Sequence, residues 1–145
     1  MAVSTRIVQS DDFESWYQLW TGYLAHYETT LPDDTKRIAF DRLLAKDTNV
    51  HGILALINDK PVGLTHYIFH DHMWRPEGVC YLQDLYADPD IRGQGIGRLL
   101  IEAVYAAADE AGRARVYWLT QDFNAPARQL YDRIANVTPF IKYER

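Results

Sequence analysis

The chain has a single cysteine, Cys80, so no disulfide can form within it. This excludes the disulfide-rich scaffolds of small secreted domains and is typical of proteins in a reducing compartment. Nowhere does the sequence contain the run of about 18 apolar residues that a membrane helix needs. The first residues, MAVSTRIVQSDDFE, lack an apolar signal core. We therefore expect a cytoplasmic protein with no membrane partner.

Positive charge is also scarce. Lysine and arginine number 15 against 20 aspartates and glutamates, which gives a formal net charge of −5. Nucleic-acid-binding surfaces are usually basic, so we expect no nucleic-acid partner. An acidic chain suits a cationic substrate such as an amine, although a mild negative charge is also ordinary. With 145 residues, 48% of them hydrophobic, the chain has the size of one domain, which we place at residues 1–145.

Apolar periodicity predicts alternating strands and helices. The helical segments are expected at residues 10–31, 38–44, 96–111 and 124–135. The strands are expected at 5–9, 51–59, 61–70, 79–87, 115–120 and 138–144. Residues 70–78 read as a loop, in which Trp74 is a candidate lid over a pocket. This order predicts a mixed α/β sheet with helices on its faces.

The stretch DIRGQGIGRLLIEAVYAAADEAGR (residues 90–113) places Gly93, Gly95 and Gly97 where a strand gives way to an amphipathic helix, which Gly112 ends. Glycine weakens a helix, so these glycines indicate a role for the backbone. The first helical turn leaves N–H groups without partners and carries the positive end of the helix dipole. Both favour a bound pyrophosphate; a tight connection without a ligand is the alternative.

Two common phosphate motifs do not fit this stretch. The Walker pattern G-x-x-x-x-G-K-S/T is absent from the chain. The dinucleotide pattern G-x-G-x-x-G fails because its sixth position is Arg98 when it starts at Gly93, and Leu100 when it starts at Gly95. The string RGQGIG at 92–97 does fit Gln/Arg-x-x-Gly-x-Gly/Ala.

This pattern resembles the acyl-CoA pyrophosphate motif of the GNAT acetyltransferase superfamily. NAPARQLY at 124–131 resembles the second signature of that family, N-x-x-A-x-x-L-Y. The resemblance implies a mixed central sheet of about six to seven strands flanked by four helices. It implies acetyl-CoA as co-substrate, no metal, and a homodimer. The cofactor-binding positions that it implies are Leu85, Tyr86, Ala87, Arg92, Gly93, Gln94, Gly95, Ile96, Gly97, Arg98 and Asn124.

The resemblance also implies direct attack of a primary amine on the thioester in a ternary complex. Backbone N–H groups at 85–87 would polarise the acetyl carbonyl; ordinary pairing in the sheet is the alternative. Tyr131 would be the general acid that protonates the departing thiolate; a core tyrosine with a wet hydroxyl is the alternative. Asn124 would cap its helix and contact the cofactor. No serine or cysteine constellation supports a covalent acyl-enzyme.

Asp84 is our candidate for the general base. Strand alternation predicts Leu82, Asp84 and Tyr86 on one face of the sheet and Gln83 on the other. The segment resembles the same strand in spermidine/spermine and thialysine acetyltransferases, and in the branch that acetylates histones or D-amino acids. Those carry Leu-Glu-Asp where this chain has Leu-Gln-Asp, so one negative charge that could bind a polycation is missing at Gln83. A surface ion pair is the alternative role for Asp84.

A small amine or amino acid is therefore the expected acceptor. A protein lysine or N-terminus is the second possibility, and an acyl-CoA-binding module without catalysis is a third. A nucleotide-binding module unrelated to CoA is opposed by the two failed motifs. His70 and His72 could suggest a metal site, but their spacing is loose and no further Cys or His cluster accompanies them.

Overall fold

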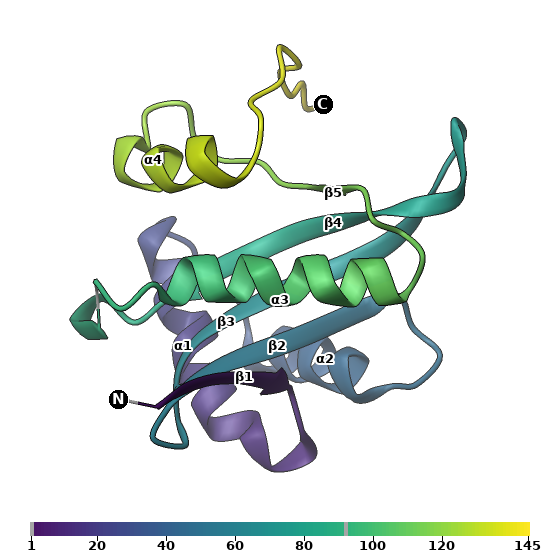
Figure 1. Ribbon diagram of the computed structural model, residues 1–145. Coiled ribbons are helices and arrows are strands. Elements are labelled where there is room, and N and C mark those ends of the chain that lie inside the picture. The colour runs from purple at the N-terminus through teal and green to yellow at the C-terminus, as the bar shows by residue number, and fades with distance from the viewer. Residues whose placement is uncertain (1, 92) are drawn as a thin grey trace.

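The computed structural model describes residues 2–91 and 93–145 and consists of one sheet with helices on both faces (Figure 1). The sheet has the order β1-β2-β3-β4-β5, with antiparallel pairing up to β4 and parallel pairing between β4 and β5. The strands are β1 Val3–Ile7, β2 Val50–Ile57, β3 Lys60–His72, β4 Arg75–Ala87 and β5 Val116–Tyr117. The helices are α1 Phe13–His26, α2 Asp33–Leu44, α3 Ile96–Glu110 and α4 Ala125–Ile134.

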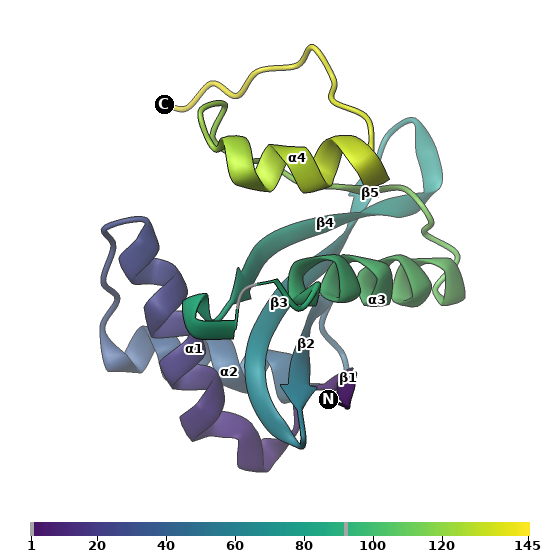
Figure 2. The same ribbon diagram turned by 60° about the vertical axis from the view of Figure 1, so that its left-hand side comes forward.

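Helices α1 and α2 cover one face of the sheet and α3 covers the other (Figure 2). The two tryptophans of α1 are buried: Trp16 is fully buried and packs on Phe40 of α2, with ring centroids 5.1 Å apart, and Trp20 is 9% exposed. On the opposite face, Leu100 and Val104 of α3 are fully buried against the sheet. In the described residues no helix combines the length and apolarity needed to cross a bilayer.

The ends of α3 carry the two glycine signals. Gly95 stands at its N-cap with φ 71°, and Gly112 follows its last turn, also with φ 71°. Beyond Gly112, the N–H of Arg113 donates back to the carbonyl of Ala108 at 2.9 Å, which closes the helix as expected.

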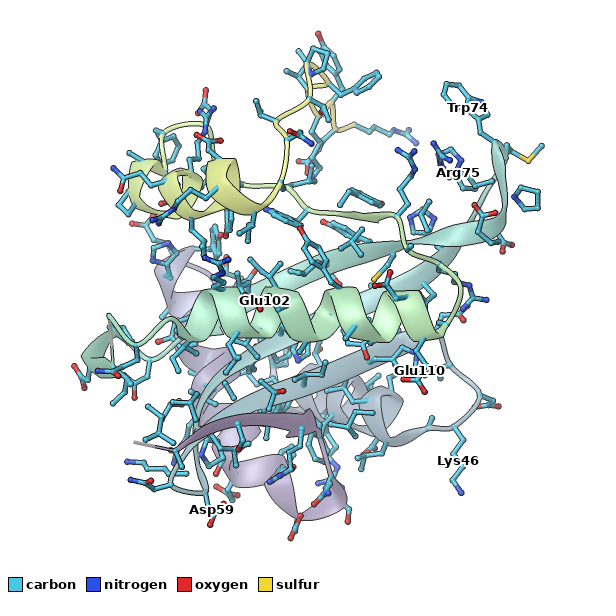
Figure 3. All side chains as sticks on the ribbon, in the orientation of Figure 1. Lys46, Asp59, Trp74, Arg75, Glu102 and Glu110 are labelled. Atoms are coloured by element: carbon cyan, nitrogen blue, oxygen red, sulfur yellow. The ribbon has the colours of Figure 1, made fainter. Side chains whose placement is uncertain are left out.

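The prediction of a long loop at residues 70–78 is wrong. Strands β3 and β4 continue through most of it and leave only Met73 and Trp74 at the tip of a hairpin. Trp74 is 85% exposed there, far along the hairpin (Figure 3), and the cavity described below does not include it. The strands could not be recognised from the sequence, because this segment is rich in charged and turn-forming residues. A hairpin that projects from the body needs no alternation of apolar residues.

The C-terminal strands also differ from expectation. The strand expected at 115–120 pairs only at Val116–Tyr117, and the strand expected at 138–144 is not formed, so the described sheet has five strands. After α4 the chain runs away from the sheet (Figures 1 and 2). Phe140 and Tyr143 are 86% and 87% exposed. The alternation of this segment suits a strand, but among the described residues it pairs with no strand of the sheet.

Candidate active site

A cavity of about 380 Å³ opens where β4 and β5 separate. The two strands pair only at Cys80–Val116 and Tyr81–Tyr117, and beyond that point the segment after β5 diverges toward α4. The cavity is lined from four sides: by α1, by the second half of β4, by the segment after β5 and by α4. Its lining residues are Gly22, Tyr23, His26, Tyr27, Leu82, Gln83, Leu85, Tyr86, Ala87, Pro89, Trp118, Leu119, Thr120, Asn124, Ala127 and Tyr131.

A β-bulge at Gln83 determines which side chains of β4 face which layer. His66 pairs with Asp84, but the next residue of β3, Tyr67, pairs with Leu82, so Gln83 is an extra residue on β4. Leu82 packs in the core under α3, whereas Asp84 turns to the face covered by α1. The predicted placement of Leu82 and Asp84 on one face is therefore wrong. Strict alternation holds only for a regular strand, and nothing in this sequence marks the bulge.

The residues expected to supply backbone donors lie on this wall of the cavity. Leu85, Tyr86 and Ala87 all line it, and within the described chain β5 pairs with none of them. In the described chain β5 therefore does not cover the edge of β4 at Leu85 and Ala87 on the cavity side. Such an edge presents peptide N–H groups to a bound molecule, so the geometry is compatible with the predicted polarisation of a carbonyl, which stays a prediction.

The glycine-rich loop leads into α3 with its backbone open. Gly93 and Gly95 have φ of 82° and 71°, and a Cβ built on either meets no atom within 4 Å. The first turn of α3 carries no acidic residue that would repel an anion. Exposed amides at the positive end of a 15-residue helix fit a pyrophosphate. Arg98 of that turn is exposed and pairs with Glu102 at 2.8 Å.

The remaining loop positions have less definite surroundings. Gln94 is exposed and Ile96 is buried in the core beneath α3. Gly97 lies next to Leu130 of α4, with a built Cβ 3.6 Å from the leucine Cδ2, so it serves close helix packing. Arg92 lies outside the described residues.

Helix α4 brings two of the predicted residues to the cavity. The Tyr131 ring packs edge-on against Trp118, with centroids 5.4 Å apart. Burial raises the pKa of Tyr131 above its ordinary value, so its hydroxyl keeps its proton at neutral pH. Asn124 occupies the N-cap position as expected, but its side chain makes no capping hydrogen bond. Its side chain lies on the cavity wall.

Behind the cavity wall lies a buried polar cluster around Asp84. The carboxylate oxygen Oδ2 is 2.8 Å from His66 Nδ1 and 3.2 Å from the indole nitrogen of Trp20. The hydroxyl of Tyr23 also acts on this carboxyl and lowers its pKa. Burial alone would raise the pKa of Asp84, but these three donors hold the pKa below its usual value.

Asp84 is thus not in the surface ion pair that was the alternative to a catalytic role: it is 8% exposed. Sequence reasoning did not find its partners. The sequence allows His66 to face the active side of the sheet and Tyr23 to line an acceptor pocket, but it links neither residue to Asp84. The available signal is the pairing of a histidine and an aspartate on neighbouring strands, which needs the register of β3 and β4.

Comparison with known proteins bears on this site. A model described as the acetyltransferase (GNAT) family matches residues 13–135. The chain is 34% identical over 145 residues to the D-amino-acid N-acetyltransferase HPA3 of Saccharomyces cerevisiae, covering 99% of this chain and 90% of that protein. It is 31% identical over 85 residues to a thialysine N-epsilon-acetyltransferase of Caenorhabditis elegans, covering 59% of this chain and 52% of that protein.

The fold also matches solved structures. The aminoglycoside N-acetyltransferase AAC(6')-Iy in complex with CoA superposes with a TM-score of 0.86, covering 99% of this chain and 94% of that chain at 18% identity. A transcriptional regulator from Bacillus halodurans superposes with a TM-score of 0.85 at 19% identity, covering 99% of both chains. At these identities the likeness concerns the fold alone.

Proposed function

Because the chain belongs to the GNAT acetyltransferase family and is an N-acetyltransferase, we propose that it transfers the acetyl group of acetyl-CoA to one small primary amine, with amino acids as the leading class. The residues that line the cavity are the main support for this acceptor class. Among the described residues around it, none is an aspartate or glutamate. A polyamine would bring several positive charges to a wall that offers none of the carboxylates needed to pair them.

The size and surface of the cavity support the same acceptor class. About 380 Å³ is room for a small molecule beside the end of the cofactor. Several lining side chains are aromatic, among them Tyr23, Tyr27 and Trp118. Aromatic walls suit the apolar side chain of an amino acid. A relative that spans nearly the whole chain is named for D-amino acids, which supports testing these first among the candidates.

The cofactor is held, in this proposal, along two elements. The amides at the start of α3, reached past Gly93 and Gly95, bind the pyrophosphate, and Arg98 turns from Glu102 to the phosphates. The backbone of β4 at Leu85–Ala87 binds the pantetheine arm and the acetyl carbonyl, with Asn124 opposite. A family that uses acetyl-CoA fits this arrangement.

The reaction itself needs one acid and one base. The amine nitrogen attacks the carbonyl carbon, the C–N bond forms, and the C–S bond breaks as the sulfur leaves with its electron pair. Tyr131 gives its proton to that sulfur, since its hydroxyl is protonated and lies on the cavity wall. The amine must lose a proton before or during attack, and Asp84 receives it.

The surroundings of the enzyme complete the proposal. The enzyme is cytoplasmic, in keeping with its single cysteine. Cys80 is fully buried, and burial raises the pKa of its thiol to about 11, so the thiol is a poor nucleophile. The enzyme forms a homodimer, because exposed Phe140, Ile141 and Tyr143 at the C-terminal end gain burial in a second copy.

The experiment measures the release of CoA thiol from acetyl-CoA over a panel of amines, each against an amine-free blank. The panel holds D- and L-amino acids, thialysine, spermidine and a lysine-rich peptide. We expect release with amino acids, D-alanine among them, and little with spermidine. Turnover confined to the peptide would instead make the protein a lysine acetyltransferase.

A further inference from the structure

Asp84 has no direct route to the acceptor. The described residues that line the cavity do not include it, and its side chain is 11% exposed. Its carboxylate faces α1, where Trp20 closes over it with an N–H donor. An amine in the cavity therefore meets another side chain before it can reach this carboxylate.

The tautomer of His66 follows from its second partner. The indole N–H of Trp16 donates to His66 Nε2 at 2.8 Å. An indole nitrogen can only donate, so Nε2 accepts and the single ring proton of a neutral imidazole sits on Nδ1. His66 Nδ1 then donates to Asp84 at 2.8 Å.

In this tautomer Asp84 and His66 carry one net negative charge, and among the described residues no lysine or arginine is paired with Asp84. Trp16 is fully buried and His66 is 6% exposed, so water does not compete for the Nε2 lone pair. A buried carboxylate held only by neutral donors attracts a proton or a cation more strongly than one paired with arginine or lysine.

Tyr23 connects this charge to the cavity. It lines the cavity from α1, and its hydroxyl acts on the Asp84 carboxyl, whose pKa it lowers. Burial and the adjacent carboxylate raise the pKa of Tyr23 well above its ordinary value, so the hydroxyl donates its proton toward Asp84 rather than losing it. Its oxygen keeps lone pairs for a donor on the cavity side.

We propose that Tyr23 carries the proton of the acceptor ammonium to Asp84, an inference that rests on the proposed function. An N–H bond of the ammonium breaks as a new O–H bond forms at Tyr23, while the original hydroxyl proton moves to the Asp84 carboxylate. The products are a free amine, an unchanged tyrosine and an Asp84 carboxyl that is neutral because one of its two oxygens has received the proton. The positive charge of the ammonium and the buried negative charge disappear together, and no oxidant or reductant takes part.

The chain offers a matched pair of variants for the test. Tyr23→Phe removes the hydroxyl next to Asp84. Tyr17→Phe removes a tyrosine hydroxyl of the same helix that bonds to an aspartate, Asp33, at 2.7 Å, but on the exposed surface. Wild type, both variants and Asp84→Asn are assayed with D-alanine, or with whichever amine of the panel turns over fastest, and acetyl-CoA affinity is measured in parallel.

We expect Tyr23→Phe to lower kcat/KM for the amine by about 100-fold, within the range of general acid–base catalysis. Acetyl-CoA affinity should stay as in wild type, and Tyr17→Phe should behave as wild type. The ratio of wild-type to Tyr23→Phe rates should fall as the pH approaches the pKa of the amine, because more of the amine then arrives without its proton. Asp84→Asn should show the same fall in its ratio.

Adding Tyr23→Phe to Asp84→Asn should cost little more, because both variants cut one proton path. Wild-type rates in Tyr23→Phe would overturn the inference while leaving the acetyltransferase intact. A defect that is equal at every pH would also overturn it, since Tyr23 would then only shape the cavity. Absence of wild-type turnover with every amine of the panel would overturn the proposed function, and this inference with it.

Discussion

Two tyrosines from different helices face the same cavity, and their neighbours give them opposite tasks. Burial and the neighbouring Asp84 carboxylate raise the pKa of Tyr23, so its hydroxyl keeps its proton on the cavity wall. Tyr131 packs on the indole of Trp118, and burial raises its pKa. A tyrosine that keeps its proton beside a leaving thiolate can only be a donor there, and this is the role we assign to Tyr131.

Replacing Tyr131 by phenylalanine tests that role. The ring and its contact with Trp118 remain, so the cavity should keep its shape. Without the proton donor, kcat should fall by about 100-fold or more, while the dissociation constant of acetyl-CoA changes little. Stopped-flow or steady-state thiol release and calorimetric titration with acetyl-CoA give the two quantities.

The control for this variant is Tyr105→Phe. Tyr105 of α3 also approaches Trp118, at 6.3 Å between ring centroids, and its hydroxyl donates to the Ile134 carbonyl at 3.1 Å. The Tyr105→Phe variant therefore lacks a tyrosine hydroxyl near the same indole, at a residue that does not line the cavity. Equal activity in Tyr131→Phe and Tyr105→Phe would remove Tyr131 as the acid.

At the scale of elements, the sequence predicts those parts whose signal is local. Helix α3, its glycine N-cap and its glycine end are all readable in residues 90–113, because capping and amphipathic spacing act within a few residues. The NAPARQLY segment likewise predicts α4 and brings Tyr131 to the cavity.

What the sequence could not predict depends on partners far along the chain. The bulge at Gln83 exists only in the register of β4 with β3, and it reverses the face on which Asp84 lies relative to Leu82. The Asp84–His66 pair depends on the same register. These long-range pairings leave no local pattern, so the proton path could not be found from residue spacing.

The glycine loop gives the prediction at this scale. Gly95→Asp should weaken CoA binding by about 100-fold or more, or about 2.7 kcal/mol, because a carboxylate replaces open space beside the phosphates. Gly112→Asp is a closely matched control: φ is 71° at both glycines and a Cβ meets nothing within 4 Å at either. The two variants therefore bear the same backbone strain, and they differ in whether the aspartate lies at the N-terminal or the C-terminal end of α3.

The helix dipole sharpens this comparison. An aspartate is stabilising at the N-terminus of a helix and destabilising at its C-terminus. Gly95→Asp should therefore unfold no more easily than Gly112→Asp in urea, and yet be the variant that loses CoA. Equal CoA affinity in the two variants would disprove the assignment of the loop to the pyrophosphate.

For the whole molecule, the distribution of apolar surface is uneven. The sheet faces are covered by α1, α2 and α3, while apolar residues gather on the C-terminal segment after α4. Val137, Phe140, Ile141 and Tyr143 are each at least 74% exposed. An exposed cluster of this kind in one segment is typical of an interaction surface, since isolated apolar residues on a surface need no partner but clusters do.

A double variant in the full chain, Phe140→Asp with Ile141→Asp, tests whether this segment joins two copies. Wild type should have the mass of a dimer by light scattering after gel filtration, and the double variant that of a monomer. Burying one such side chain stabilises by about 1.5–3 kcal/mol, and each 1.4 kcal/mol is about tenfold in Kd, so the shift should exceed 100-fold. Lys142→Ala, which removes only an exposed pair with Glu144 at 2.6 Å, should remain dimeric. A monomeric wild type, or a double variant that keeps the dimer mass, would show that the segment does not join two copies.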